Sequence, residues 1–410
     1  MEEGKETKGK LMMEMKRQRA SGRDSKEERD RLSELSDCVL LHIMKFMDTR
    51  YAVQTCILSK RWKNLWKCLT TLYFHDRYFR SIENFNKFVS QVLSSRDSSI
   101  PVLNLHFCPF NITPAKLLNR VMKYAVMHNV QKLRINISFP TNMPNLFDPQ
   151  IFSCPSLTVL ELYNSGPPLE LPKFLQLPAL KNLLLTNVSF TPSDNDCAEP
   201  FSTCKLLNTL VLQGCSLHKD AKVLLISNSN LSSLNLDNTF QATPNNLDTF
   251  QHKIVLSTPN LSSLTIMDYL SFSCHQLSST CDLSFLEEGS ICTTLPKIIG
   301  WLQVFTNVKT LTLNSETLRI LLNDLSKLPT MSTQPPCLVR LESLKVQMIP
   351  WISISDEEVN KSCYHKLLKV ISLVSDALFL GRIVGNIKEV EEKVLRGRYR
   401  TKGMEISVLN

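Results

Sequence analysis

The stretch that decides how this chain is organised is DRLSELSDCVLLHIMKFMDTRYAVQTCILSKRWKNLW, from Asp30 to Trp66. Its apolar residues recur one, three and four positions apart in three successive runs, the spacing that gathers side chains on one face of a helix. The stretch contains neither Gly nor Pro. We therefore predict three short amphipathic helices here. A unit this small rarely holds a strong core alone, so we expect it to pack against a partner.

Polar residues that favour helix starts stand before each run. Ser36 and Asp37 precede the first run, Asp48 and Thr49 precede the second, and Ser59 precedes the third, which contains two tryptophans. Side chains of these types accept hydrogen bonds from backbone N–H groups at a helix N-terminus. The periodicity alone would equally suit a three-helix corner of a larger core, so the residue types have to decide.

Three short sequence motifs favour a separate partner-binding unit over a corner of a larger core. They are Asp30-Arg31-Leu32-Ser33-Glu34-Leu35, then Asp37 with Leu40-Leu41, and Leu58-Ser59-Lys60-Arg61-Trp62 followed by Leu65-Trp66. The stretch resembles the F-box of plant proteins, the module that docks on a Skp-type adaptor of a cullin ubiquitin ligase. The resemblance implies an adaptor-binding surface at Leu32, Leu35, Ser36, Asp37, Val39, Leu40, Leu41, Trp62 and Trp66.

One position departs from the family pattern. The family usually has Pro after the second Leu of its opening motif, and this chain has Ser36. Proline would restrict the unfolded backbone, so we expect Ser36 to weaken adaptor binding by roughly 0.5–1 kcal/mol.

Beyond Pro101 a unit of the form Leu-x-x-Leu-x-Leu, or a conservative variant, begins to recur. Its central leucines, at positions 133, 160, 183, 210, 234 and 264, are 27, 23, 27, 24 and 30 residues apart. That is the period of leucine-rich repeats, whose units stack because none can cover its own apolar side. Copies around Leu311 and Leu344 follow gaps of 47 and 33 residues. We expect these gaps to hold insertions, such as Cys274 to Thr294, or unrecognised copies; chance clustering of leucine is the alternative.

The predicted fold class is therefore α followed by α/β, with a three-helix F-box leading into an irregular leucine-rich repeat solenoid built on a curved parallel sheet. This order resembles the plant F-box/LRR proteins. We predict the following division of the chain: a disordered charged tail over 1–29, the F-box over 30–75, a connecting helix over 76–100, repeats over 101–350, and a C-terminal helix with a basic tail over 351–410.

Strand geometry predicts which residues of each repeat are available for binding. The last two leucines of the motif point into the core, so the residues between and beside them face the opposite, concave side. This face is mostly uncharged and hydrogen-bonding, with outward positions running from Lys132 and Arg134 to Asn314 and Gln347. It suits a protein target. The predicted target-binding residues are Glu161, Tyr163, Leu184, Thr186, Val211, Gln213, Asn235 and Asp237.

Composition excludes several other classes. We find no apolar run long enough to span a bilayer and no secretory signal. Thirteen cysteines without a Cys-x-x-Cys pattern indicate reduced thiols, in the nucleus or cytoplasm or both. Cys274, His275 and Cys281 match no common zinc spacing. We expect no cofactor, no metal, no membrane partner and no catalytic residue.

The predicted function is that of a substrate-recognition subunit of an SCF-type ubiquitin ligase, with the adaptor, and through it the cullin, as one partner and a target protein as the other. Three alternatives stay open. Six Asn-x-Ser/Thr triplets suggest an extracellular repeat protein. The net charge of +9 suggests weak nucleic-acid association. The F-box could also serve assembly without degradation.

Overall fold

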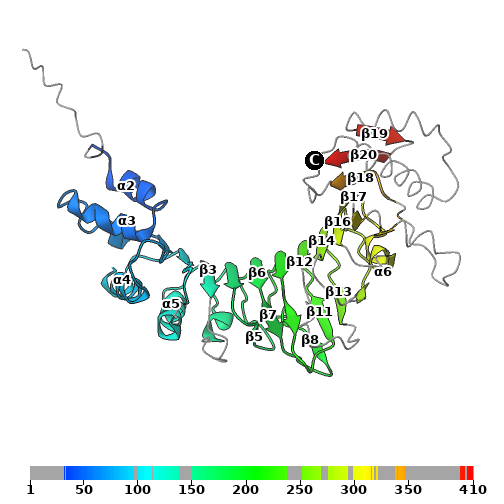
Figure 1. The fold of residues 1–410 in the computed structure, drawn as a ribbon, viewed down its shortest axis with the longest axis horizontal. Helices are drawn as coiled ribbons and strands as arrows, with labels where there is room; N and C mark the ends of the chain where they lie inside the picture. Colours follow the sequence, from blue (N-terminus) through cyan, green and yellow to red (C-terminus); the bar gives the residue numbers. More distant parts are fainter. Residues whose placement is uncertain are drawn as a thin grey trace, which may run out of the picture.

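The computed structural model describes residues 32, 34–96, 99–112, 114–137, 149–237, 252–268, 276–293, 299–314, 316–317, 320–321, 338, 340–347, 398–401 and 404–409. A helical N-terminal part leads into a curved solenoid (Figure 1). The predicted tail over 1–29 and the helix expected around Leu367 lie outside the described residues.

Two of the three predicted N-terminal helices are regular. They are α2, Asp37–Met44, and α3, Thr49–Gln54. The third run is instead a series of turns ending in a 3-10 helix, Leu65–Cys68, so the prediction of a third α-helix was wrong. The small core of this part consists of apolar side chains from all three runs: Leu40, Met44, Ala52, Trp62, Leu65 and Trp66.

The predicted helix starts differ in how they are capped. Asp48 caps α3, because its Oδ1 accepts a hydrogen bond from Arg50 N at 2.7 Å. Ser36 occupies the N-cap position of α2, yet its side chain makes no capping hydrogen bond. The start of α2 is held instead by the Ser36 carbonyl, which accepts from Val39 N and Leu40 N.

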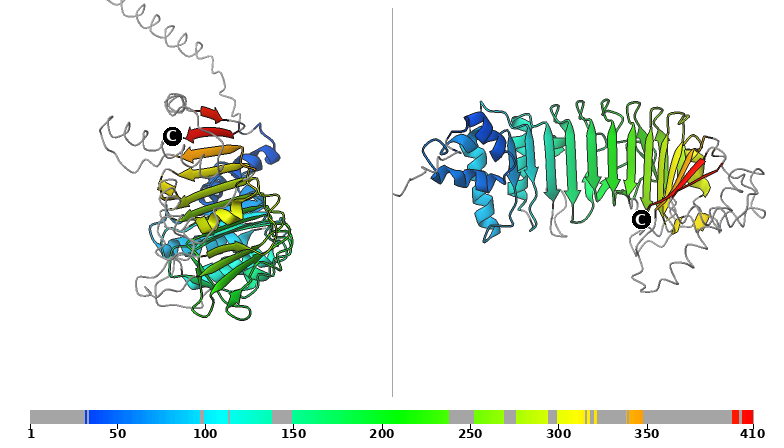
Figure 2. Two further views of the ribbon diagram at one scale, coloured as in Figure 1. Left: turned by 90° about the vertical axis from the view of Figure 1, so that its right-hand side faces the viewer. Right: turned by 90° about the horizontal axis from the view of Figure 1, so that it is seen from above.

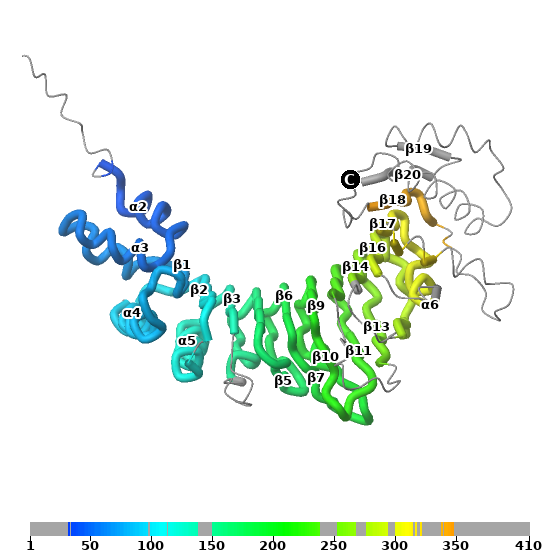
Figure 3. Tube along the Cα trace, viewed as in Figure 1, coloured from blue at the N-terminus to red at the C-terminus, as the bar shows by residue number. Residues whose placement is uncertain are grey.

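The helix expected after this part is α4, Ile82–Ser95, and a further helix, α5, spans Ala115–Met127. Ser81 caps α4 by accepting a hydrogen bond from Asn84 N. Both helices are strongly amphipathic and bury one apolar face in the common core. They lie on the convex side of the solenoid (Figures 1 and 3).

The concave side is one sheet of thirteen strands, seen face-on in the right-hand view of Figure 2. Its strands follow the chain order except for the last two: β1 Thr71–Phe74, β2 Asn104–Phe107, β3 Lys132–Ile137, β4 Val159–Asn164, β6 Asn182–Thr186, β9 Thr209–Gln213, β12 Ser233–Asp237, β14 Ser263–Asp268, β16 Glu288–Thr293, β17 Thr310–Asn314, β18 Ser343–Gln347, β20 Met404–Leu409 and β19 Arg398–Thr401. All neighbours pair in parallel except β19 and β20. The parallel-sheet solenoid predicted from the leucine period is thus confirmed.

The register aligns the central leucines of successive repeats. Leu133 pairs with Leu160, Leu160 with Leu183, and so on through Leu210, Leu234 and Leu264. These leucines are buried, while the residues between them are partly or wholly exposed. The alternation follows from the two-residue side-chain period of a strand. It separates a continuous apolar core from an open concave face.

Five strands of the main sheet carried no predicted repeat motif: β1, β2, β16, β19 and β20. Strands β1 and β2 precede the first predicted copy and pair Leu72 with Leu105, and Leu105 with Leu133. Strand β16 lies within the expected insertion Cys274 to Thr294 and places Gly289 where its neighbours have leucine. The Phe305 ring fills that space: a Cβ on Gly289 would lie 2.6 Å from Phe305 Cδ1.

Tight turns connect the concave strands to the convex side. Asn187 and Gly214 follow β6 and β9 directly and have φ values of 53° and 57°. Gly and Asn are the residues that adopt this left-handed conformation at least cost. Asn187 N donates to Gln213 O at 2.7 Å, and Gly214 N donates to Asp237 O at 2.8 Å. Each turn therefore hydrogen-bonds to the end of the next strand.

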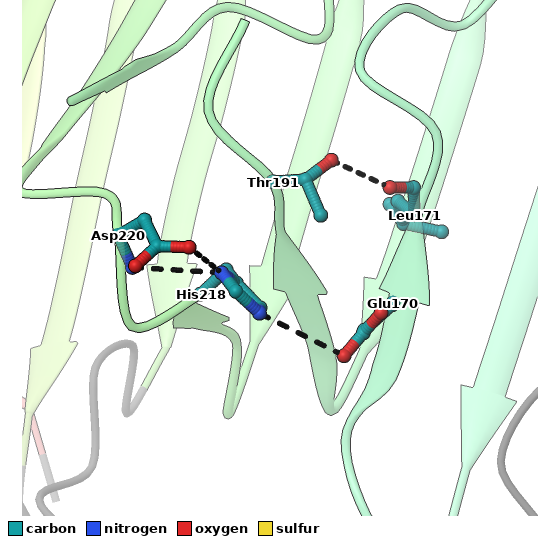
Figure 4. A network of polar contacts seen from close by, with 5 residues as sticks. All are labelled: Glu170, Leu171, Thr191, His218 and Asp220. Atoms are coloured by element: carbon teal, nitrogen blue, oxygen red, sulfur yellow. Dashed lines mark hydrogen bonds and ion pairs between the residues drawn. The ribbon is translucent and has the colours of Figure 1, made fainter. Parts of the chain in front are cut away.

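Two small parallel sheets form the convex side in the middle of the solenoid. One contains β5 Leu169–Leu171, β7 Val188–Phe190 and β10 Ser216–Leu217. The other contains β8 Cys197–Ala198, β11 Val223–Ser227, β13 Lys253–Ser257 and β15 Gln276–Ser279. At the edge of the first, His218 lies 3.3 Å from an Asp220 oxygen and 4.0 Å from a Glu170 oxygen (Figure 4).

The end of the chain also joins the sheet. The expected basic tail contains β19 and β20, an antiparallel pair whose second strand extends the main sheet by pairing in parallel with β18. The order of strands thus departs from the sequence only here. In the part of the chain that the structure describes, no helix combines the length and apolar character needed to cross a membrane.

Candidate functional site

Two surfaces carry the residues that the sequence singled out, and the first is on the N-terminal helices. Leu32, Ser36, Asp37 and Val39 are exposed there, and Leu35 and Leu41 are half-buried against the core. Leu40 is 0 % exposed. Trp62 and Trp66 are buried as well. Leu40, Trp62 and Trp66 therefore belong to the core that holds the helices together beneath the exposed residues.

Sequence reasoning missed several residues of this surface. Ile43 and Phe46 on and after α2, and Ile57 and Leu58 after α3, are large apolar side chains open to solvent. Ile57 is 84 % exposed and Phe46 is 71 % exposed. The runs are apolar on more than one face, and periodicity does not say which face the core covers. Four large apolar side chains exposed within sixteen residues of sequence make this part of the chain a candidate protein-binding surface.

Asp37 also has a structural partner. Its Oδ1 accepts a hydrogen bond from Arg61 Nε at 2.7 Å, and Arg61 also donates to the Leu35 carbonyl. These contacts tie the Arg61-Trp62 motif to the start of α2. Because both side chains are partly exposed, the ion pair adds little free energy and serves mainly to fix the geometry.

The second surface is the concave face of the sheet. The predicted target-binding residues all lie on outward positions of neighbouring strands: Glu161, Tyr163, Leu184, Thr186, Val211, Gln213, Asn235 and Asp237. One residue that was predicted to face outward, Asn314, does not lie on the exposed face. Asn314 is buried, because its Oδ1 turns inward and accepts a hydrogen bond from Thr317 N at 2.6 Å.

A hydrogen-bonded row crosses the middle of this face. Thr186 Oγ1 donates to Gln213 Oε1 at 3.2 Å, and Gln213 Nε2 is 3.5 Å from Asp237 Oδ2. Partial burial raises the pKa of the Asp237 carboxyl above its usual value. Beside this row, Leu184 pairs with Val211 and forms an apolar strip.

Charged and aromatic groups gather on the first strands instead. Arg134 Nη1 lies 3.5 Å from Glu161 Oε2, and the Arg134 guanidinium lies 4.8 Å from the centre of the Tyr163 ring. The Tyr163 hydroxyl is 3.3 Å from the same Glu161 oxygen. Burial, followed by the Glu161 charge, raises the pKa of Tyr163, so the hydroxyl stays a donor at neutral pH.

At the other end of the face, β14, β16, β17 and β18 surround a cavity of about 140 Å³. Hydroxyl groups dominate its lining: Ser263, Thr265, Ser290, Thr310 and Thr312, with Glu288 and Lys345 at the margin. Among the described residues, no group of three or more His, Cys, Asp or Glu side chains could hold a metal ion.

Four of the six Asn-x-Ser/Thr triplets have a structural explanation. Asn187 Nδ2 donates to Gly166 O, Asn230 Nδ2 to Lys205 O and Asn260 Nδ2 to Ser229 O, at 2.6 to 2.7 Å. Each bond joins one repeat to the preceding one. Asn111 Nδ2 likewise donates to the buried Asp76. These four amides link neighbouring turns of the solenoid, which gives the asparagines of these triplets a structural role.

Comparison with known proteins identifies both the helical part and the repeats. The F-box domain family matches residues 32–71, and the family described as "FBD-associated F-box protein At5g56370, LRR repeats" matches residues 118–285. The chain therefore belongs to the family of plant F-box/LRR-repeat proteins.

Individual relatives are moderately similar. The FBD-associated F-box protein At5g38590 of Arabidopsis thaliana is 32 % identical over 294 residues, which cover 70 % of this chain and 67 % of that protein. The putative F-box/LRR-repeat protein At4g15060, also of Arabidopsis thaliana, is 29 % identical over 302 residues, 70 % of this chain and 68 % of the relative.

Proposed function

We propose that this chain is the substrate-recognition subunit of an SCF-type ubiquitin ligase. Its N-terminal helices would bind a Skp-type adaptor, and its concave face would bind the target. The observation that carries the proposal is the exposed apolar surface of the small helical part. Its own core is closed by Leu40, Trp62 and Trp66, yet large side chains such as Ile57 and Phe46 face solvent.

The chain itself would act by bringing reactants together. Holding a target next to a ubiquitin-conjugating enzyme raises the effective concentration of its lysines, and the catalytic groups belong to the partners. The ten cysteines in the described part of the chain are all free thiols, which supports a role in the nucleus or cytoplasm over an extracellular one.

Direct measurement of adaptor binding tests the proposal. We expect a purified Skp-type adaptor to bind the full chain by biolayer interferometry. The double substitution Ile57→Asp, Leu58→Asp should weaken binding at least about 30-fold, the loss typical of removing central anchors. Both side chains are exposed, so the fold should survive.

Phe285→Asp is the matched control, because Phe285 is also a large exposed apolar residue but lies in the solenoid. It should leave the adaptor affinity unchanged. Failure of the folded wild-type chain to bind the adaptor, or equal binding by all three proteins, would overturn the proposal.

A further inference from the structure

The first strands of the concave sheet carry a set of rings and cations that the central strands lack. The register aligns Tyr73 of β1 with His106 of β2, Arg134 of β3 and Glu161 of β4. Together with the loops that follow β1 and β2, these strands present six side chains that we name the first-strand cluster: Tyr73, His75, His106, Phe110, Arg134 and Tyr163.

Ring contacts organise this cluster. The Tyr73 and His106 rings stack with centroids 4.4 Å apart and planes 22° apart. The His75 and Phe110 rings stack at 5.9 Å and 26°. His75 Nδ1 is also 2.9 Å from the Cys108 carbonyl. The rings are therefore held in place before any partner arrives, which lowers the entropy cost of binding.

A buried carboxylate fixes the loop that carries Phe110. Asp76 is 3 % exposed, and its two oxygens accept hydrogen bonds from Phe110 N at 2.8 Å and from Asn111 N at 2.9 Å. Burying a charge is costly unless hydrogen bonds compensate it, and here they do. The result is a rigid loop that leaves Phe110 68 % exposed. A large aromatic ring held open to solvent is a typical binding anchor.

The charges around the cluster favour an acidic partner. Arg134 is 45 % exposed, and its guanidinium has more N–H donors than its contact with Glu161 uses. Arg77 lies 5.9 Å from the Phe110 ring centre. Three nearby acids have internal partners. Glu161 contacts Arg134 and Tyr163, Asp76 holds the loop, and Asp48, which interacts with His75, caps α3.

We propose that the first-strand cluster binds an acidic segment of the target protein that also presents an apolar anchor. The proposal rests on the proposed target-receptor function and names the chemistry of the target. Parallel strands lie about 4.8 Å apart, so Leu184, two strands beyond Arg134, is about 10 Å away. An extended chain covers that distance in about three residues. The preferred segment therefore has an acidic residue with an aliphatic residue about three positions away.

A protein segment fits this surface better than single-stranded nucleic acid. A nucleic-acid chain follows a continuous cationic track beside its stacking rings. After Arg134 the aligned row continues with Glu161, Leu184, Val211, Asn235, Thr265, Ser290 and Thr312, and reaches a cation only at Lys345. An acid followed by an apolar strip would interrupt such a track and instead suits a peptide.

Selection from a random library tests the inference without a known target. Phage displaying random 12-residue peptides would be selected on the purified full chain, and the selected peptides measured by fluorescence anisotropy. We expect them to be enriched in Asp or Glu, with an aliphatic residue about three positions away. Arg134→Glu and Phe110→Ala should each weaken their binding tenfold or more.

Controls separate the outcomes. Lys345→Glu changes the same charge at the far end of the same row and should leave peptide affinity within twofold. Selection of no peptides, selection of peptides without acidic residues, or equal binding by Arg134→Glu would overturn the inference. So would a 12-nucleotide poly-U strand that binds more tightly than the peptides and displaces them.

Adaptor binding is measured on the same proteins and distinguishes the two proposals. If the adaptor does not bind but acidic peptides depend on Arg134, the ligase function fails and the binding site stands. If the adaptor binds and Arg134→Glu has no effect on the peptides, the inference fails and the ligase function stands. Circular dichroism of Arg134→Glu confirms that the fold is intact.

Discussion

The substitution Gly289→Ala tests how the solenoid accommodates a repeat that has no central leucine. A Cβ at this position would lie 2.6 Å from Cδ1 and 2.9 Å from Cε1 of Phe305, and 3.3 Å from a Leu311 methyl. Favourable carbon–carbon contacts lie at about 3.5–4.0 Å, so the overlap with the ring is about 1 Å. Phe305 is 0 % exposed and cannot swing into solvent. Overpacking of this kind costs about 1–3 kcal/mol of unfolding free energy.

A double-mutant cycle identifies the cause of that loss. Phe305→Leu alone should cost about 1–2 kcal/mol, because it leaves a cavity beneath β16. In the double variant the methyl group added at position 289 would enter that cavity. The combined loss should therefore fall short of the sum by about 0.5–3 kcal/mol, the range seen for residues in contact.

Urea unfolding followed by far-ultraviolet circular dichroism measures each free energy. Gly300→Ala is the matched control, since Gly300 is an exposed residue of the short helix α6, Ile299–Leu302, with nothing within 4 Å of its Cβ position. It should stabilise the chain by about 0.5–1 kcal/mol. A Gly289→Ala variant as stable as wild type to within about 0.5 kcal/mol, or strictly additive losses, would refute the reasoning.

Three further predictions concern single residues. Asp48→Ala should lower the unfolding free energy by about 1 kcal/mol by removing the α3 cap, whereas Asp48→Asn should keep it; equal urea midpoints for both would contradict the capping role. Burial, with the Arg134 charge, lowers the pKa of His106 below 6.5, so the unfolded chain binds this proton more readily. His106 therefore stabilises the fold fully only above about pH 6.5, and stability should fall as the pH drops below it. His106→Gln should make the unfolding free energy less dependent on pH between 7.5 and 5.5, and an unchanged slope would count against this. Finally, burial raises the pKa of the Cys215 thiol to about 12, so iodoacetamide should label exposed Cys38 in the native chain but Cys215 only in urea, as peptide mass spectrometry would show.

The sequence predicted the repeats wherever leucine occupies the central core position of a strand and Leu, Ile or Val occupies the next one. The six leucines from Leu133 to Leu264 pair in one continuous row, as their spacing required. The motif failed where another residue fills the same volume. Phe74 and Phe107 replace the last leucine in β1 and β2, and Phe305 occupies the space above Gly289. A side chain from a distant part of the sequence can fill the core space that a leucine of the motif would occupy. A motif of six consecutive residues cannot detect such a replacement.

The candidate surfaces were predictable to different degrees. Strand alternation placed every residue predicted to bind the target outward, because a period of two leaves one choice of face. On the N-terminal helices the runs are apolar on more than one side, so sequence assigned Leu40 to the surface and missed Ile57. In the first-strand cluster, Arg134 and Tyr163 were predicted to face outward, but Tyr73 and His106 were missed because they lie on strands that the leucine motif does not detect.

Under the proposed ligase function, the junction between α3 and the first strand has a consequence for which lysines of a target would be modified. Tyr73 N donates to Thr49 Oγ1 at 2.8 Å, Arg50 donates to the Tyr78 carbonyl, and the Arg50 guanidinium lies 5.0 Å from the centre of the Phe79 ring. These contacts fix the orientation of the helical part relative to the first strands of the solenoid. If the two surfaces serve adaptor and target, the chain would hold the target at a fixed distance and orientation from the adaptor, whereas a flexible linker would let both vary. The position of a lysine on the target, measured from its docking segment, would then determine whether ubiquitin reaches it.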